Sequence, residues 1–171
     1  MKMFGSSHVV VLSAVLLASV TSACSSAEPN PTATSSAPTA TPADFTTVAS
    51  TTLEISSVGN DLKFDKVTLR TAVGQVVQLT LHNEAEAAAL QHNWVLVKDG
   101  ATEAVGEAAL AAGPSNNYVP MNDTRVIAHT NLASGGQSES INFEAPAAGR
   151  YEFICSFPGH YTLMRGEFIV E

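Results

Sequence analysis

Apolar and polar residues alternate along most of the chain after about residue 46. Eight short segments follow this period of two, are rich in Val, Ile, Thr, Phe and Leu, and are separated by Gly, Asn, Asp or Pro. The segments are TTLEISS (51–57), LKFDKVTLR (62–70), GQVVQLTLHN (74–83), NWVLV (93–97), DTRVIAHT (123–130), SESINFEA (138–145), GRYEFICSF (149–157) and RGEFIVE (165–171). Because side chains on a strand point alternately to opposite faces, each segment is a predicted strand. The pattern predicts an all-β fold, a Greek-key sandwich or barrel of about eight strands.

Two segments depart from this alternation. ATEAVGEAALAAG (101–113) is alanine-rich, with acids near its start and glycine at its end, which predicts a short helix inserted between strands. EAEAAAL (84–90) is expected to add one more helical turn. We find no internal repeat, and residues 46–171 are long enough to form one domain with its own core.

The N-terminus has the composition of an export signal. Lys2 is followed by an apolar run from Val9 to Val20 and then by small residues up to Cys24. Because the run is shorter than the ~20 residues that span a bilayer, residues 1–23 are a predicted signal peptide rather than a membrane helix or a buried N-terminal element.

The residues that follow suggest a tether to the membrane. Cys24 comes directly after VTSA, as in a bacterial lipoprotein cleavage site, although Thr21 stands where such sites usually carry Leu. Cys24 is therefore a predicted lipid anchor, with ordinary cleavage between small residues as the alternative. Residues 24–45 are mostly Ala, Ser, Thr and Pro, which predicts a disordered tether. We expect the domain on the outer, periplasmic side of the cell membrane.

The charge of the chain is acidic. It has 8 basic and 16 acidic side chains, a formal net charge of −8, and loss of Lys2 with the leader makes this −9. Such a charge argues against a nucleic-acid partner and is compatible with steering toward a basic protein.

The chain has only two cysteines, Cys24 and Cys155. A disulfide between them would tie the tether to an internal strand, so we expect instead that Cys155 is a free thiol in an oxidising compartment. A free thiol there is a liability unless something protects or uses it.

The segment CSFPGHYTLM (155–164) places Cys155, His160 and Met164 on a predicted turn between two strands. A thiolate, two imidazoles and a weak axial thioether form the blue-copper arrangement, so this segment predicts a second histidine nearby. His92, at the mouth of the strand in QHNWVLV, is the natural candidate. His82 and His129 have no soft ligand beside them and are interpreted as structural residues.

Three segments resemble azurin-type blue copper proteins of the cupredoxin family: HNWVLV from His92, RVIAHT from Arg125 and CSFPGHYTLMRG from Cys155. The start at Cys24 and the tether resemble more closely the auracyanins, membrane-tethered azurin relatives of filamentous photosynthetic bacteria. The resemblance covers roughly residues 55–171. It implies one copper ion in a trigonal plane of His92, Cys155 and His160. Met164 would be the long axial ligand.

The resemblance also implies roles for residues around the ligands. Asn93 and Ser156 would join the two ligand loops by hydrogen bonds, and the backbone N–H groups of Asn93 and Phe157 would point at the Cys155 sulfur. Azurins have glycine before the first ligand histidine, and its carbonyl is a weak fifth contact. Gln91 stands there in this chain, which puts that contact in doubt. The disulfide of azurins is also missing.

The implied function is one-electron transfer, without enzymatic activity. Electrons would pass through His160, with Phe157, Pro158 and Met121 as an apolar docking rim. Trp94 is interpreted as a core side chain. A membrane quinol-oxidising complex would be the donor, and a c-type cytochrome or photosynthetic reaction centre the acceptor. The domain itself is expected to be monomeric.

Two other classes remain open. In a thiol enzyme, Cys155 would be the nucleophile with His92 or His160 as base, but Met164 would have no role. In a metal-handling protein the same residues would store or deliver copper, or hold structural zinc. A thioether is not a firm zinc ligand, and delivery favours a more exposed site.

Overall fold

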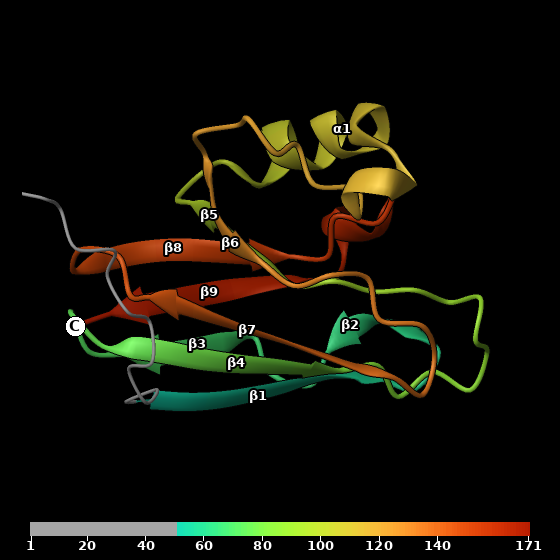
Figure 1. Cartoon of the computed structure of the whole chain (residues 1–171), viewed down its shortest axis with the longest axis horizontal. Coiled ribbons are helices and arrows are strands. Elements are labelled where there is room, and N and C mark those ends of the chain that lie inside the picture. Colours follow the sequence, from blue (N-terminus) through green and yellow to red (C-terminus); the bar gives the residue numbers. More distant parts are fainter. Residues whose placement is uncertain (1–50) are drawn as a thin grey trace, which may run out of the picture. The chain divides into compact units, whose positions relative to one another are not determined.

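The computed structural model describes residues 51–171 (Figure 1). The predicted signal peptide, Cys24 and the tether lie outside the described residues, so these domain assignments stay predictions. Within residues 51–171, none of the helices is both long enough and apolar enough to cross a membrane.

The described residues form two β-sheets that face each other (Figure 1). The strands are β1 (Thr51–Val58), β2 (Asp61–Phe64), β3 (Thr68–Thr71), β4 (Val76–His82), β5 (Val95–Lys98), β6 (Val126–His129), β7 (Ser138–Glu144), β8 (Gly149–Ile154) and β9 (Arg165–Val170). One sheet has the order β2-β1-β4-β7 and the other β3-β9-β8-β5-β6. The prediction of an all-β sandwich is confirmed, and the two separate sheets make it a sandwich rather than a closed barrel.

The predicted strand at 62–70 is two strands in the structure. β2 pairs with β1 in the first sheet, whereas β3 pairs with β9 in the second. The chain crosses between the sheets after Phe64, where Asp65 accepts a hydrogen bond from the Ser56 N–H at 2.8 Å and donates its own N–H to the Ser56 carbonyl at 2.9 Å. The alternation of apolar residues continues through residues 62–70 although the chain changes from one sheet to the other, so the pattern alone does not reveal the change.

The predicted helix at 101–113 is confirmed as α1 (Thr102–Ala112). It ends at Gly113, whose φ of 72° lies in the left-handed region that glycine tolerates. Val105 and Ala109 on its inner face are buried, and Val105 packs with Val95 and Ile154 over the outer face of the second sheet.

The expected helical turn at 84–90 was wrong. The Leu90 N–H donates to the Ala87 carbonyl at 2.9 Å, which closes a single turn, and the segment is otherwise a loop of bends and turns. Asn83 is buried and donates to the carbonyls of Leu90 and Ala133, both at 2.8 Å, so it ties both ends of this loop to the body of the domain.

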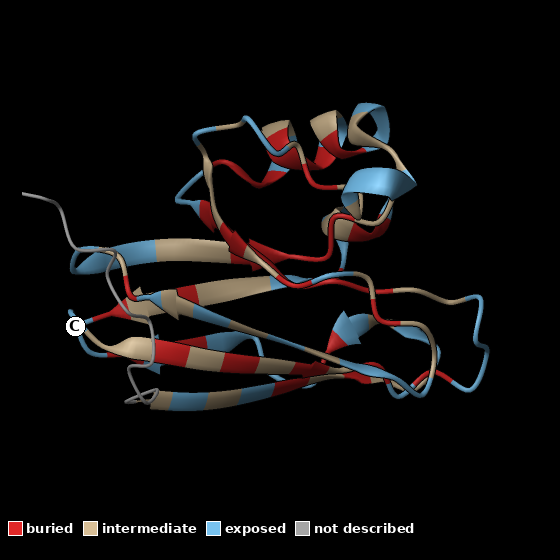
Figure 2. Ribbon diagram, in the orientation of Figure 1, coloured by how far each residue is buried: buried red, intermediate tan, exposed pale blue. Residues whose placement is uncertain are grey.

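The main core lies between the sheets (Figure 2). Trp94 is fully buried there, as predicted, and its ring contacts those of Phe143, Phe153 and Phe168. Trp94 immediately follows His92 and Asn93, so the core fixes the start of β5, where the candidate site lies.

Candidate metal centre

The segment between β8 and β9 is a closed hairpin. Cys155 directly follows β8, and its N–H donates to the Met164 carbonyl at 2.9 Å. A short 3₁₀ helix, η2 (His160–Thr162), begins after Gly159, whose φ of 84° requires a left-handed turn. The His160 carbonyl then accepts the Met164 N–H at 2.8 Å. These bonds hold the thiol, the imidazole and the thioether of one hairpin in fixed relative positions.

His92 reaches the same place from a different part of the chain. It lies three residues before β5, where it forms an isolated antiparallel bridge with Ala133, with N–H to carbonyl distances of 3.0 and 2.8 Å. β5 pairs with β8, and Val95 lies opposite Ile154. The residues just beyond this pair, His92 on one strand and Cys155 on the other, therefore meet at the same end of the sheet.

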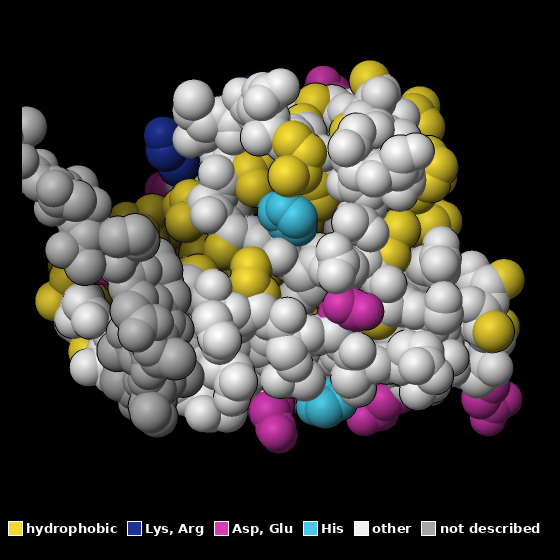
Figure 3. All heavy atoms as spheres, in the orientation of Figure 1, with side chains coloured by type: hydrophobic (Ala, Val, Ile, Leu, Met, Phe, Trp, Pro, Cys, Tyr) yellow, Lys and Arg dark blue, Asp and Glu magenta, His cyan; other side chains and the backbone are white. Residues whose placement is uncertain are grey.

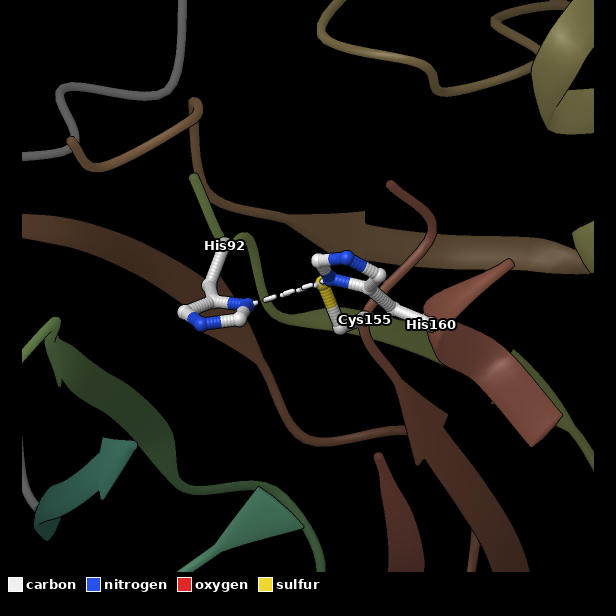
Figure 4. A group of neighbouring side chains, drawn as sticks. All are labelled: His92, Cys155 and His160. Carbon is white, nitrogen blue, oxygen red and sulfur yellow. Dashed lines mark hydrogen bonds between the residues drawn. The ribbon is translucent and has the colours of Figure 1, made fainter. Parts of the chain in front are cut away.

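The three side chains converge on one point (Figure 4). The Cys155 Sγ lies 3.7 Å from the Nδ1 of His92 and 3.5 Å from the Nδ1 of His160, and the two nitrogens are 3.2 Å apart. A trigonal ion at about 2.0–2.3 Å from nitrogen and sulfur would separate such atoms by about 3.5–3.8 Å. The two sulfur–nitrogen distances match this spacing and the nitrogen–nitrogen distance is slightly shorter, so a small separation of the two rings would let the three donors hold one metal ion. One sulfur and two imidazole nitrogens suit copper.

Met164, the predicted axial ligand, lies on the same hairpin as Cys155 and His160. Its side chain is fully buried and belongs to the same core cluster as Cys155. The two backbone hydrogen bonds described above join it to both Cys155 and His160. A thioether held there is available as a weak axial donor.

The Cys155 sulfur accepts hydrogen bonds from the backbone N–H groups of Asn93 and Phe157. The Asn93 side chain joins the two ligand loops, because its Nδ2 donates to the Ser156 Oγ at 2.9 Å and its Oδ1 accepts the Ser156 N–H at 2.8 Å. Gln91 is half-buried and its Nε2 donates to the Ser134 Oγ at 3.2 Å. The contact of its carbonyl with copper stays a prediction.

Burial determines the protonation of the metal-free site. It raises the pKa of the Cys155 thiol to about 12, although the two N–H donors oppose this rise. Burial, and then the proximity of His160, lowers the pKa of His92 to about 4, and burial also lowers the pKa of His160. At neutral pH the thiol is protonated and both imidazoles are neutral.

Copper binding at pH 7 is therefore expected to release one proton per ion. The thiol must ionise to bind, while both imidazoles already have free electron pairs. Affinity should fall about tenfold for each unit of acidification while both imidazoles are neutral, and more steeply once His160, or His92 with its pKa of about 4, also holds a proton. Calorimetric titration of the metal-free protein with copper, in buffers of different ionisation enthalpy, measures the number of protons released per ion. Cys155→Ser is the control and should release no proton at pH 7, whereas two protons from the unmodified protein would contradict the prediction.

His82 and His129, the other histidines within residues 51–171, are not part of this cluster, and Met121 lies on the surface. His82 ends β4 and its Nδ1 is 2.8 Å from the Ser138 Oγ, and His129 ends β6 with its Nδ1 3.1 Å from the Thr130 carbonyl. Met121 is 59% exposed and lines a surface cavity between α1 and residues 119–125. Its part in a docking rim stays a prediction.

Sequence reasoning missed Asn117 and Tyr118. The Asn117 carbonyl accepts a hydrogen bond from the Asn93 Nδ2 at 2.8 Å, and the Tyr118 ring contacts the Phe157 ring, with centroids 5.1 Å apart. The only available signal was the pair Asn116-Asn117 after a proline, which is typical of a turn but carries no sign of contact with a metal site.

Residues 51–171 match the plastocyanin/azurin family of copper binding proteins. Auracyanin-A of Chloroflexus aurantiacus is 46% identical over 121 residues, which are 70% of this chain and 74% of that protein. Azurin-1 of Alcaligenes xylosoxydans xylosoxydans is 40% identical over 119 residues, covering 66% of this chain and 92% of that one. The solved structure of auracyanin A, a "blue" copper protein of the same Chloroflexus, has a TM-score of 0.65 at 45% identity, covering 70% of this chain and 98% of that structure.

Proposed function

Because the chain belongs to the plastocyanin/azurin family of copper-binding proteins, we propose that it is a one-electron carrier and not an enzyme. Its type 1 copper would be held by His92, Cys155 and His160, with Met164 as the axial ligand. The observation that carries this proposal is the convergence of the Cys155 sulfur and the two Nδ1 atoms within 4.8 Å of one another, all three residues being buried.

Copper bound there would supply a couple that gains and loses one electron without a substrate. The residues around the site hold the donor side chains in fixed positions. Cys155 and His160 are fixed by the hairpin, His92 by its bridge to Ala133, and the loops are joined through Asn93 and Ser156. Because these contacts do not depend on the charge of the site, both redox states can keep nearly the same donor positions. Small rearrangement favours fast electron transfer.

The surface route for the electron would be the ring of His160. This side chain is 7% exposed, whereas His92 and Cys155 are fully buried. The Phe157 ring lies against it, with centroids 4.7 Å apart, and Pro158 is half-buried beside it on the same turn. An apolar rim around a nearly buried histidine suits brief docking, in which a small dry contact forms and separates quickly.

The proposed partners are a membrane quinol-oxidising complex as donor and a c-type cytochrome or photosynthetic reaction centre as acceptor, in a photosynthetic or respiratory chain. Support comes from the likeness to auracyanin-A and from charge. Acidic side chains gather along the lower edge of the face in Figure 3, over the first sheet and away from η2, so they would attract a basic partner at long range rather than contact it at the rim. We further propose that the domain is exported, works as a monomer and is held at the outer side of the membrane by lipidated Cys24.

The two alternative classes fit the site less well. A nucleophilic cysteine needs a lowered pKa and access to substrate, but Cys155 is fully buried and its pKa is raised. A delivery protein needs ligands that a receiving protein can reach, but three of the four candidate ligands are fully buried.

The test is an absorption spectrum of the purified protein after loading with Cu(II), followed by a redox titration. We expect an intense visible band that bleaches on adding ascorbate and returns on reoxidation, with one electron exchanged per protein. A protein that stays colourless in excess Cu(II) and keeps no copper after desalting would overturn the electron-carrier proposal.

A further inference from the structure

Two consecutive residues outside the ligand loops have an unusual backbone conformation. Asn117 and Tyr118 have φ angles of 54° and 55°, and they are the non-glycine residues with positive φ in the described part of the chain. Asparagine adopts a left-handed conformation more readily than other non-glycine residues, whereas a tyrosine pays about 1–3 kcal/mol for it and keeps it only where surrounding contacts impose it. The contacts of these two residues lead to the candidate copper site.

Asn117 holds Asn93 through its backbone. Its carbonyl accepts a hydrogen bond from the Asn93 Nδ2 at 2.8 Å, and Asn93 is fully buried. The remaining side-chain bonds of Asn93 go to Ser156. The position of the Asn93 N–H, which donates to the Cys155 sulfur, therefore depends on where Asn117 places its carbonyl.

The Asn117 side chain fixes this carbonyl in place. Its Oδ1 accepts the Leu132 N–H at 3.1 Å and its Nδ2 donates to the Asn131 Oδ1 at 3.2 Å. Leu132 directly precedes Ala133, which forms the bridge with His92. Asn117 thus connects the segment after α1 to Asn93, which follows the ligand His92, and to Leu132, which precedes the bridge partner of His92.

Tyr118 acts on the second N–H donor. Its ring meets the Phe157 ring edge-on, with centroids 5.1 Å apart and planes at 70°, and Phe157 in turn lies against His160. The Phe157 N–H is the other donor to the Cys155 sulfur. Tyr118 thereby restricts the loop that carries this N–H.

We propose that Asn117 and Tyr118 are positioning residues that set the reduction potential of the copper centre by holding the two N–H donors against the Cys155 sulfur. The inference rests on the proposed function. Hydrogen bonds to the sulfur withdraw charge from it and weaken its donation to Cu(II), so they favour Cu(I). Loosening either donor should lower the reduction potential.

The test compares two disruptive variants with matched controls. Asn117→Gly keeps the left-handed backbone but loses both side-chain bonds, and Tyr118→Asn tolerates positive φ but loses the ring. Each should shift the Cu(II)/Cu(I) equilibrium with a redox mediator about tenfold toward Cu(II), a fall of 59 mV for one electron. Tyr118→Phe keeps the ring, so it should stay near the unmodified potential.

Asn116→Ala is the control for general loosening. The Asn116 side chain is exposed and donates to the Ala112 carbonyl at 2.9 Å, on the same segment. It should leave the potential unchanged. Amide hydrogen exchange in the reduced, diamagnetic protein gives a second readout: exchange at Asn93 should quicken in Asn117→Gly, and exchange at Phe157 in Tyr118→Asn.

The outcomes separate this inference from the proposed function. If the unmodified protein has no reversible one-electron couple, the proposed function fails. If it has one, but Asn117→Gly and Tyr118→Asn match their controls or Asn116→Ala lowers the potential equally, the positioning role alone is refuted. Should Asn117→Gly not fold, the comparison of Tyr118→Asn with Tyr118→Phe decides.

Discussion

Replacing Cys155 by alanine is expected to abolish the intense visible absorption of the copper-loaded protein completely. In a blue copper site the colour arises from charge transfer between the cysteine sulfur and Cu(II), and Cys155 is the cysteine of the candidate cluster. His92 and His160 would remain as two nitrogen donors without a thiolate. Copper affinity should fall by several orders of magnitude, since an anionic soft ligand is lost from a buried site. Visible spectroscopy and competition with a copper chelator measure the two effects.

Ser156→Ala is the matched control for this variant. It removes a hydroxyl from the adjacent buried residue and one hydrogen bond from Asn93, but it keeps the thiol. Its visible band should remain. Retention of an intense band in Cys155→Ala would mean that the sulfur does not bind copper, and the site assignment would then be wrong.

The second large effect is expected from Trp94→Ala, which should lower the free energy of unfolding by about 3–5 kcal/mol. Trp94 is fully buried among Phe143, Phe153 and Phe168. Its backbone N–H donates to the Thr130 Oγ1 at 3.0 Å and its carbonyl accepts the Thr130 N–H at 2.9 Å; the substitution keeps both bonds, so the loss comes from the side chain. The truncation leaves a large cavity next to His92 and Asn93. Because domains are stable by about 5–15 kcal/mol, much of the stability would be lost.

Denaturant unfolding followed by circular dichroism measures this change, since Trp94 is the single tryptophan and its fluorescence disappears with the substitution. Trp94→Phe is the control and should cost clearly less, because it keeps an aromatic ring in the cluster. The indole N–H has no hydrogen-bond partner in the structure, so the phenylalanine variant loses no polar contact there. A Trp94→Ala protein as stable as the control would show that the core collapses around the gap.

Much of the fold was predictable because most strands and the helix are determined by the pattern of residues within each segment. The alternation within β4, β7 and β9 gave their faces directly, and the alanine-rich run with its terminal glycine gave α1. The split between β2 and β3 was not predictable, since it depends on which sheet each half joins. The loop at 84–90 was not predictable because its path is set by contacts with distant parts of the chain: the Glu84 N–H donates to Ser57, and Asn83 donates to the Ala133 carbonyl.

The candidate site divides in the same way. Cys155, His160 and Met164 lie within ten residues on one hairpin, so their spacing in the sequence predicted a site for a soft metal ion. His92 could be chosen only because the blue-copper arrangement requires a second imidazole. Asn117 and Tyr118 could not be found at all: their left-handed backbone and their contacts with Asn93 and Phe157 arise from packing of the segment after α1.

The division of the donors between one hairpin and one distant residue affects the order in which the site assembles. Cys155 and His160 are 5 residues apart, whereas Cys155 and His92 are 63 residues apart. Loop-closure entropy rises with this separation, and a hairpin forms within about 1–10 μs. Bringing the three donors of the hairpin together therefore costs less loop-closure entropy than adding His92. Because an isolated hairpin is only marginally stable in water, we expect the donors to be held in place only once His92 docks against Ala133 and the sheet forms.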